Sequence, residues 1–69
     1  MPLVLARPGE KNSIKRIGGR DDTRKRLETL GFVVGGDVTV VSKINGNMIV
    51  TVKDARVALS REMADKILV

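Results

Sequence analysis

The chain contains no cysteine and no histidine. The lack of cysteine excludes disulfide bonds, and both absences together remove the side chains that usually bind zinc, copper or iron. A catalytic nucleophile would have to be a serine beside a lysine, and nothing in the sequence positions Ser13, Ser42 or Ser60 in this way. We therefore predict that the protein is not an enzyme and that it has no metal site and no cofactor.

Aromatic residues and long apolar runs are also scarce. Phe32 is the only aromatic residue, so side chains on which single-stranded nucleic acid could stack are missing. No apolar run reaches the roughly 18 residues that a membrane-spanning helix requires. The N-terminal residues MPLVLARPG lack the charged start of a signal peptide, and we expect a cytoplasmic location.

Positive charge is concentrated in the first 26 residues. The formal net charge is +5 at pH 7, and the chain after Arg26 carries equal numbers of basic and acidic residues. Such a patch can bind nucleic acid, an anionic membrane surface or an acidic protein, or it can simply keep a small protein in solution. Six basic residues are the candidate partner contacts: Lys15, Arg16, Arg20, Arg24, Lys25 and Arg26.

The length predicts a single domain over residues 1–69, with a small core. Its first part indicates two strands. Residues 3–6 are apolar and end at the turn pair Pro8-Gly9, and residues 11–17 form the second strand. Strict alternation would expose one of the two isoleucines in that strand, so we expect a bulge near residues 15–16.

One helix is predicted over about residues 22–30. Leu27 and Leu30, three residues apart, define its buried stripe. Its start carries three residues that can serve as the N-cap: Asp21, Asp22 and Thr23.

Gly31 suits the position after this helix, where a left-handed conformation favours a residue without a Cβ. With Leu30 as the C-cap, Leu27 and Phe32 are the pair whose side chains usually touch in a Schellman ending. We expect Gly35, together with Gly36, to turn the chain into the next strand.

Residues 37–44 and 48–53 show the clearest strand patterns, joined across Asn45-Gly46. A two-residue turn is the first interpretation, but it would place polar and apolar residues on one face. A loop with an odd number of residues aligns Val38 and Val40 with Val50 and Val52, and we favour it, with Gly46 left-handed at a bulge.

The last part of the chain predicts a turn at residues 53–55, a strand at 56–59 and a helical turn at about 60–66. Ser60 is placed to cap this helical turn, and residues 67–69 form a last strand. Short strands in so small a chain need closure to bury their edges. The expected fold is mainly β: a small, partly open SH3-like barrel of five to six short strands.

Five motifs follow one another along the chain in an order that is typical of a known family. They are IKRIGG, the helix ending LETLGFVVGG, DVTVV, VALSREMA and a terminal ILV. Together they resemble the ferrous iron transport protein A family (FeoA) from Leu3 to Val69. The resemblance implies an SH3-like barrel that assists the large GTP-binding permease, FeoB, which carries ferrous iron inward. It also implies docking on this permease, which places the protein at the inner face of the membrane when the two are bound. The family is associated with ferrous iron, but without His or Cys we expect no direct iron site here.

Other functions stay open at this point. A small basic barrel could bind nucleic acid, although the missing aromatic residues weigh against it. The chain could also be related to the SH3-like domain at the C-terminus of iron-dependent repressors. In those proteins the domain is attached to a helix-turn-helix module, which this sequence does not contain. Carboxylates at Asp21, Asp22 or Asp37 could sense metal, but capping and turn formation are their commoner roles. Outward-facing Val41 and Ile49 could support self-association.

Overall fold

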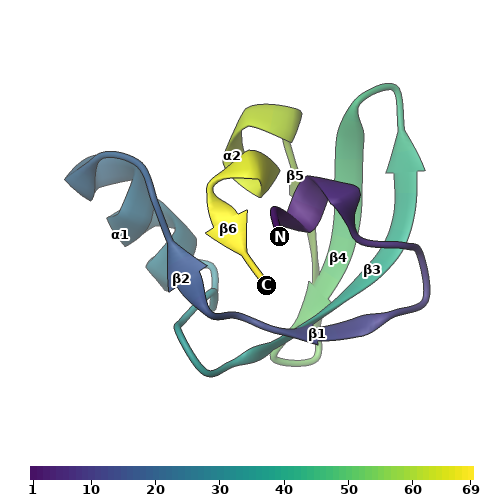
Figure 1. Ribbon diagram of the computed structural model, residues 1–69, viewed down its shortest axis with the longest axis horizontal. Coiled ribbons are helices and arrows are strands. Elements are labelled where there is room, and N and C mark those ends of the chain that lie inside the picture. The colour runs from purple at the N-terminus through teal and green to yellow at the C-terminus, as the bar shows by residue number, and fades with distance from the viewer.

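The computed structural model describes residues 1–69. The elements in chain order are the 3-10 helix η1 (Leu3–Leu5), β1 (Lys11–Ser13), β2 (Arg16–Ile17), α1 (Asp21–Thr29), β3 (Asp37–Ile44), β4 (Asn47–Val52), β5 (Ala55–Leu59), α2 (Arg61–Asp65) and β6 (Ile67–Leu68). Figure 1 shows α1 at one end of the molecule and the β3–β4 hairpin at the other, with α2 and β6 between them. The mainly β architecture of six short strands confirms the predicted class.

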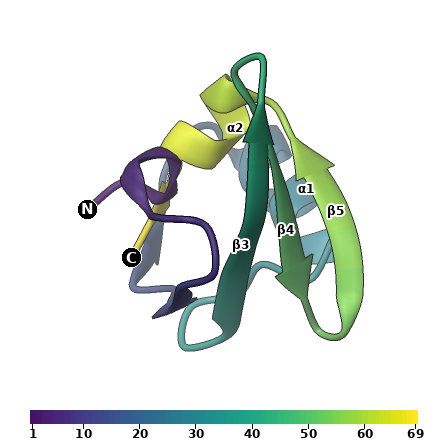
Figure 2. The same ribbon diagram turned by 90° about the vertical axis from the view of Figure 1, so that its right-hand side faces the viewer.

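The strands form two antiparallel sheets around one core. The larger sheet has the order β1-β3-β4-β5, and β2 pairs with β6 in the smaller one. Figure 2 shows β3, β4 and β5 side by side, with α1 behind them. The core contains no polar or charged side chain, and it consists of Leu3, Ala6, Ile14, Leu27, Phe32, Val38, Val40, Met48, Val50, Val52, Leu59, Ala64 and Ile67. None of the helices is long and apolar enough to cross a membrane.

The end of α1 is the predicted Schellman motif. Gly31 has a φ of 107°, and its N–H donates to the carbonyl oxygen of Glu28 at 3.0 Å. The N–H of Phe32 donates to the carbonyl oxygen of Leu27 at 2.9 Å, which closes the outer bond of the motif. Leu27 and Phe32 are both fully buried in the same core cluster. The glycine therefore reverses the chain and returns Phe32 to the core beside the helix.

Replacing Gly31 with alanine should lower the free energy of unfolding by about 1 kcal/mol or more, because a Cβ disfavours a positive φ. The added Cβ would lie 3.5 Å from the side chains of Val52 and Lys53, an ordinary contact, so the cost is in the backbone. Thermal unfolding followed by circular dichroism measures it as a fall of roughly 4–8 °C. Gly18→Ala is the matched control, since its φ is not left-handed and its nearest atom is 3.7 Å away. Equal melting of both variants and the wild type would contradict this explanation.

Two expectations about α1 are wrong. The N-cap is Arg20, which makes no side-chain capping bond, and both aspartates lie inside the first turn. There their charges interact favourably with the positive end of the helix dipole without capping it. Leu30 is 39% exposed, so Leu27 alone is buried. Phe32, folded back by the glycine, fills the core where a second helical leucine was expected.

Residues 3–6 are not a strand. Leu5 donates its N–H to the carbonyl oxygen of Pro2 at 3.0 Å, and Ala6 donates to Leu3 at 2.9 Å, which defines a 3-10 turn. Leu3 and Ala6 are buried, whereas Leu5 is 64% exposed. Residues three apart lie above one another in a 3-10 helix, so this short turn buries both without strand alternation.

Residues 11–17 form two strands in different sheets rather than one bulged strand. Ile14 still follows the larger sheet: its N–H donates to the carbonyl oxygen of Gly36 at 2.8 Å. Lys15 already follows the smaller one, because its N–H donates to the carbonyl oxygen of Leu68 at 2.8 Å. Ile14 is buried and Ile17 packs against the core. Crossing between sheets therefore turns both isoleucines inward, as the bulge was expected to do.

The β3–β4 hairpin combines the two alternatives that the sequence offered. Val38 pairs with Val52 and Val40 with Val50, as favoured, but the turn has only the two residues Asn45 and Gly46. Both have a positive φ, of 48° and 83°, as a type I′ turn requires. The extra residue lies in the register shift between Val40 and Ser42, not at Gly46. The expected bulge exists, at a different place.

The remaining local predictions are mostly confirmed. Ser60 accepts a hydrogen bond from the N–H of Met63 at 3.3 Å and caps α2. The Pro8-Gly9 turn is present, closed by the N–H of Glu10 donating to the carbonyl oxygen of Arg7 at 3.2 Å. The turn after β4 is one residue shorter than expected, so β5 begins at Ala55.

Candidate functional site

The six predicted partner contacts all lie on the surface at the α1 end of the molecule or on the chain leading to it. Every one of their side chains is exposed. Lys15 links β1 to β2, Arg16 lies in β2, Arg20 is the N-cap of α1, and the others are on α1 itself. We call these six residues the basic cluster: Lys15, Arg16, Arg20, Arg24, Lys25 and Arg26.

The shape of α1 explains how it can carry so many cations. The helix has nine residues and buries only Leu27, so most of its circumference faces solvent. Successive helical residues are rotated by about 100°, so the three consecutive cations spread over roughly 200° of this exposed surface. The cations therefore surround the free side of α1 rather than converging on one point.

Most of the cluster has no partner within the protein. Arg24 forms an ion pair with Asp21, one turn earlier. The other five side chains make no ion pair and no hydrogen bond: Lys15, Arg16, Arg20, Lys25 and Arg26. Exposed cations without internal partners contribute little to folding, but they attract anionic surfaces over a range of about 8–10 Å at moderate salt. This arrangement suits recognition of a negatively charged partner.

A shallow groove, which sequence reasoning missed, runs beside α1. Its volume is about 270 Å³, and its lining residues are Ile17, Arg24, Glu28, Phe32, Val33 and Val34. Val34 is 66% exposed, although it is a large apolar residue. We call this feature the α1 groove. One signal for this groove was present in the sequence. Val33 and Val34 follow Phe32, and the Schellman motif that ends α1 requires neither of them, so they were candidates for an apolar surface.

The residues singled out for the helix joint and the turns have structural positions. Leu27 and Phe32 are in the core, Leu30 is partly exposed, and Gly31 holds the reversal. Gly35 and Gly46 also have positive φ values, of 87° and 83°, with open space where a Cβ would lie. These positions shape the backbone and offer no groups for chemistry.

The residues present do not fit a metal site for iron. No group of three or more His, Cys, Asp or Glu side chains comes together. The three carboxylates considered from the sequence have local partners instead. Asp21 pairs with Arg24, Asp22 accepts a hydrogen bond from the N–H of Thr23 at 2.8 Å, and Asp37 lies 3.4 Å from Lys11. The absence of a metal site and of a cofactor stays a prediction.

Two small sheets around an apolar core, with all charged groups on the outside, define a small β-barrel domain. The chain belongs to the FeoA domain family, whose model matches residues 1–69. It is 32% identical over 68 residues to a protein of Methanocaldococcus jannaschii named as an Fe(2+) transport protein A. That similarity spans 99% of this chain and 83% of the relative.

Solved structures confirm the SH3-like barrel. The FeoA of Stenotrophomonas maltophilia, described as a prokaryotic SH3 domain protein and solved with zinc, superposes with a TM-score of 0.85 at 26% identity. The match covers 99% of this chain and 87% of that one. A manganese-dependent transcriptional repressor matches with a TM-score of 0.89 at 20% identity, over 97% of this chain and 39% of its own. At that identity the repressor shows a shared fold and nothing more.

Proposed function

We propose that this chain is an accessory protein of ferrous iron uptake. It acts as an interaction module for a FeoB-type GTPase permease, in the cytoplasm and peripheral to the inner face of the membrane when bound. Membership of the FeoA family and the name of the M. jannaschii relative support a role in iron transport. The choice of a FeoB-type permease follows from the resemblance to the family, and the site described above supports a partner with an acidic or anionic face.

The observation that carries this proposal is a set of five exposed cations without an ion-pair partner at the α1 end of the molecule, which also carries a small apolar groove. The cations attract an acidic face of the permease or the anionic lipids around it, and such attraction raises association rates and orients the partners. The α1 groove offers Val33 and Val34 for contact at short range. Protein interfaces usually combine apolar contacts with polar and charged groups at their edge.

Nucleic-acid binding is the second candidate and has less support. Phe32 is fully buried, so no aromatic side chain is available to stack on a base. A binding mode made only of phosphate contacts would weaken steeply as salt rises.

Uptake of radioactive ferrous iron by the source organism tests the proposal. Deleting the gene for this chain should slow uptake severalfold, and expressing the wild-type chain should restore the rate. Expression of a variant with glutamate at Arg20 and Lys25 should restore it only in part, because the cluster then repels an acidic partner. Uptake at the wild-type rate in the deletion strain would refute the accessory role.

A further inference from the structure

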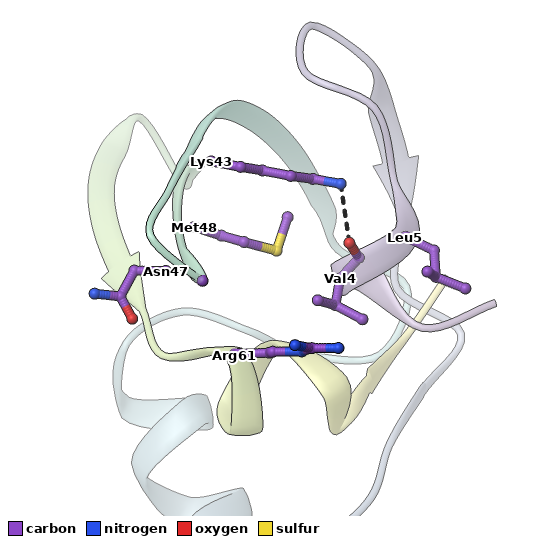
Figure 3. A pocket seen from close by; sticks show the side chains of 7 residues that line it. Val4, Leu5, Lys43, Asn47, Met48 and Arg61 are labelled. Carbon is purple, nitrogen blue, oxygen red and sulfur yellow. Dashed lines mark hydrogen bonds between the residues drawn. The ribbon is translucent and has the colours of Figure 1, made fainter.

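A second pocket lies at the opposite end of the molecule from α1. Its volume is about 290 Å³, and it is formed by Val4, Leu5, Lys43, Gly46, Asn47, Met48 and Arg61. These residues come from η1, the end of the β3–β4 hairpin and the first position of α2. Figure 3 shows Lys43 and Arg61 on either side of Met48, both extending toward Val4 and Leu5. The pocket therefore has an apolar floor between two cations.

The charged residues that line this pocket are all positive. Two of its lining residues are cations and none is a carboxylate. Neither Lys43 nor Arg61 takes part in an ion pair. Lys43 is held in place because its Nζ donates to the carbonyl oxygen of Val4 at 2.9 Å (Figure 3). An ammonium group has three N–H donors, so Lys43 can still donate to a bound anion.

The floor is apolar and partly open. Met48 is buried in the core, whereas Leu5 is largely exposed at the rim. Methionine is unbranched and adapts its shape to different apolar groups. The site therefore offers a contact for one apolar side chain, with cations on both sides of it.

We propose that this pocket binds an acidic peptide segment of a partner protein. An apolar side chain of the segment packs on Val4 and Leu5 beside the buried Met48, and its flanking carboxylates accept hydrogen bonds from Lys43 and Arg61. Charge complementarity supports this occupant, because the pocket carries two cations without an ion-pair partner and no anion. A second copy of this chain fits less well, since each copy carries a formal net charge of +5.

The size of the pocket is in accord with a short segment. Sites for drug-sized ligands usually enclose about 300–1,000 Å³, so a pocket of about 290 Å³ accommodates one side chain and its neighbouring groups. None of its lining residues belongs to the basic cluster or the α1 groove. The pocket thus adds a second recognition site that goes beyond the proposed function of the α1 end.

Titration of the 15N-labelled protein with a capped pentapeptide, Gly-Asp-Leu-Asp-Gly, tests this proposal. The amide signals of Gly46, Asn47 and Met48 should shift in a saturable manner. The matched peptide Gly-Asn-Leu-Asn-Gly should bind roughly tenfold more weakly, because charge-assisted hydrogen bonds are lost. Equal binding of the two peptides, or no shift of these amides at millimolar peptide, would overturn the proposal.

Variants of the two cations assign the effect to the pocket. Lys43→Gln and Arg61→Gln should each weaken binding of the acidic peptide and reduce its advantage over the asparagine peptide. Arg56→Gln, on an exposed position of β5 outside the pocket, is the control and should bind as the wild type does. Arg61→Gln leaves the bond from Lys43 to Val4 intact, so it remains informative if Lys43→Gln disturbs η1.

Binding to vesicles of phosphatidylglycerol and phosphatidylcholine shows whether the pocket recognises a peptide or a lipid surface. The double variant Lys43→Gln with Arg61→Gln should bind such vesicles nearly as well as the wild type, because the basic cluster is unchanged. If vesicles shift the pocket amides and the acidic peptide does not, the pocket recognises lipid and the peptide assignment is wrong. Failure of the peptide test leaves the iron-uptake result unaffected, so the two proposals fail separately.

Discussion

Replacing Phe32 with alanine should remove a large part of the free energy of unfolding of this protein. Phe32 is fully buried and has the largest side chain in the core. Truncating a buried phenylalanine costs about 3–5 kcal/mol, because apolar contacts are lost and a cavity remains. A domain of this length is stabilised by only roughly 3–10 kcal/mol in total. The loss also removes the residue that anchors the end of α1 to the core.

Urea unfolding followed by far-ultraviolet circular dichroism measures this effect. The chain has no tryptophan and no tyrosine, so intrinsic fluorescence gives no useful signal. Val34→Ala is the control: Val34 lies two residues further on and is largely exposed, so its change should stay within about 0.5 kcal/mol. An unfolding midpoint of Phe32→Ala close to that of the wild type would show that the core does not depend on this residue.

Reversing two charges on the basic cluster should weaken association with the membrane-embedded permease roughly tenfold or more. Arg20→Glu with Lys25→Glu changes two exposed cations that have no ion-pair partner. Each basic residue near an anionic surface contributes about 1 kcal/mol, and a reversal adds repulsion to the lost attraction. Glutamate at position 20 precedes the helix, where negative charge is favourable, so α1 should stay folded.

Binding to the permease in nanodiscs of anionic lipid measures this prediction. The control is Arg7→Glu with Arg56→Glu, which makes the same change of net charge at exposed positions outside α1. Raising the salt from about 0.1 M to about 1 M shortens the Debye length from about 10 Å to about 3 Å, and it should reduce the difference between wild type and variant. Equal losses in both double variants would indicate a response to net charge alone and would rule out a specific role for the basic cluster.

Local rules predicted the parts of the fold that depend on neighbouring residues. The Schellman ending at Gly31 follows from the conformational freedom of glycine and the spacing of Leu27 and Phe32. Ser60 caps α2 for an equally local reason, because a hydroxyl reaches an N–H three residues later. Such features could be placed from the sequence because no distant segment decides them.

Features that depend on distant segments could not be placed in this way. Residues 3–5 have the composition of a strand, but they form a 3-10 turn that lies against α2. The position of the bulge after Val40 depends on which valines of β3 and β4 face the core. The two-residue turn at Asn45-Gly46 depends instead on the local preference of these residues for a positive φ. Face alternation revealed that an extra residue was needed, but not where it would lie.

Of the candidate site, only the part that depends on residue type could be predicted from the sequence. The six cations were evident from charge alone, and the structure places all of them on the surface. The α1 groove brings Ile17 together with Val33 and Val34, which are separated by the whole of α1. The pocket between Lys43 and Arg61 likewise joins segments that only the tertiary fold brings together. The two valines after Phe32 were the one sequence signal for the groove, and the lining residues of the pocket carried no such signal.

Co-purification of the wild-type chain with the FeoB-type permease of the same organism in detergent tests the central claim most directly. The account predicts that the two proteins elute together at micromolar concentration, and that the Arg20→Glu, Lys25→Glu variant is largely lost from the complex. Separate elution of the wild-type chain and the permease under these conditions would contradict it.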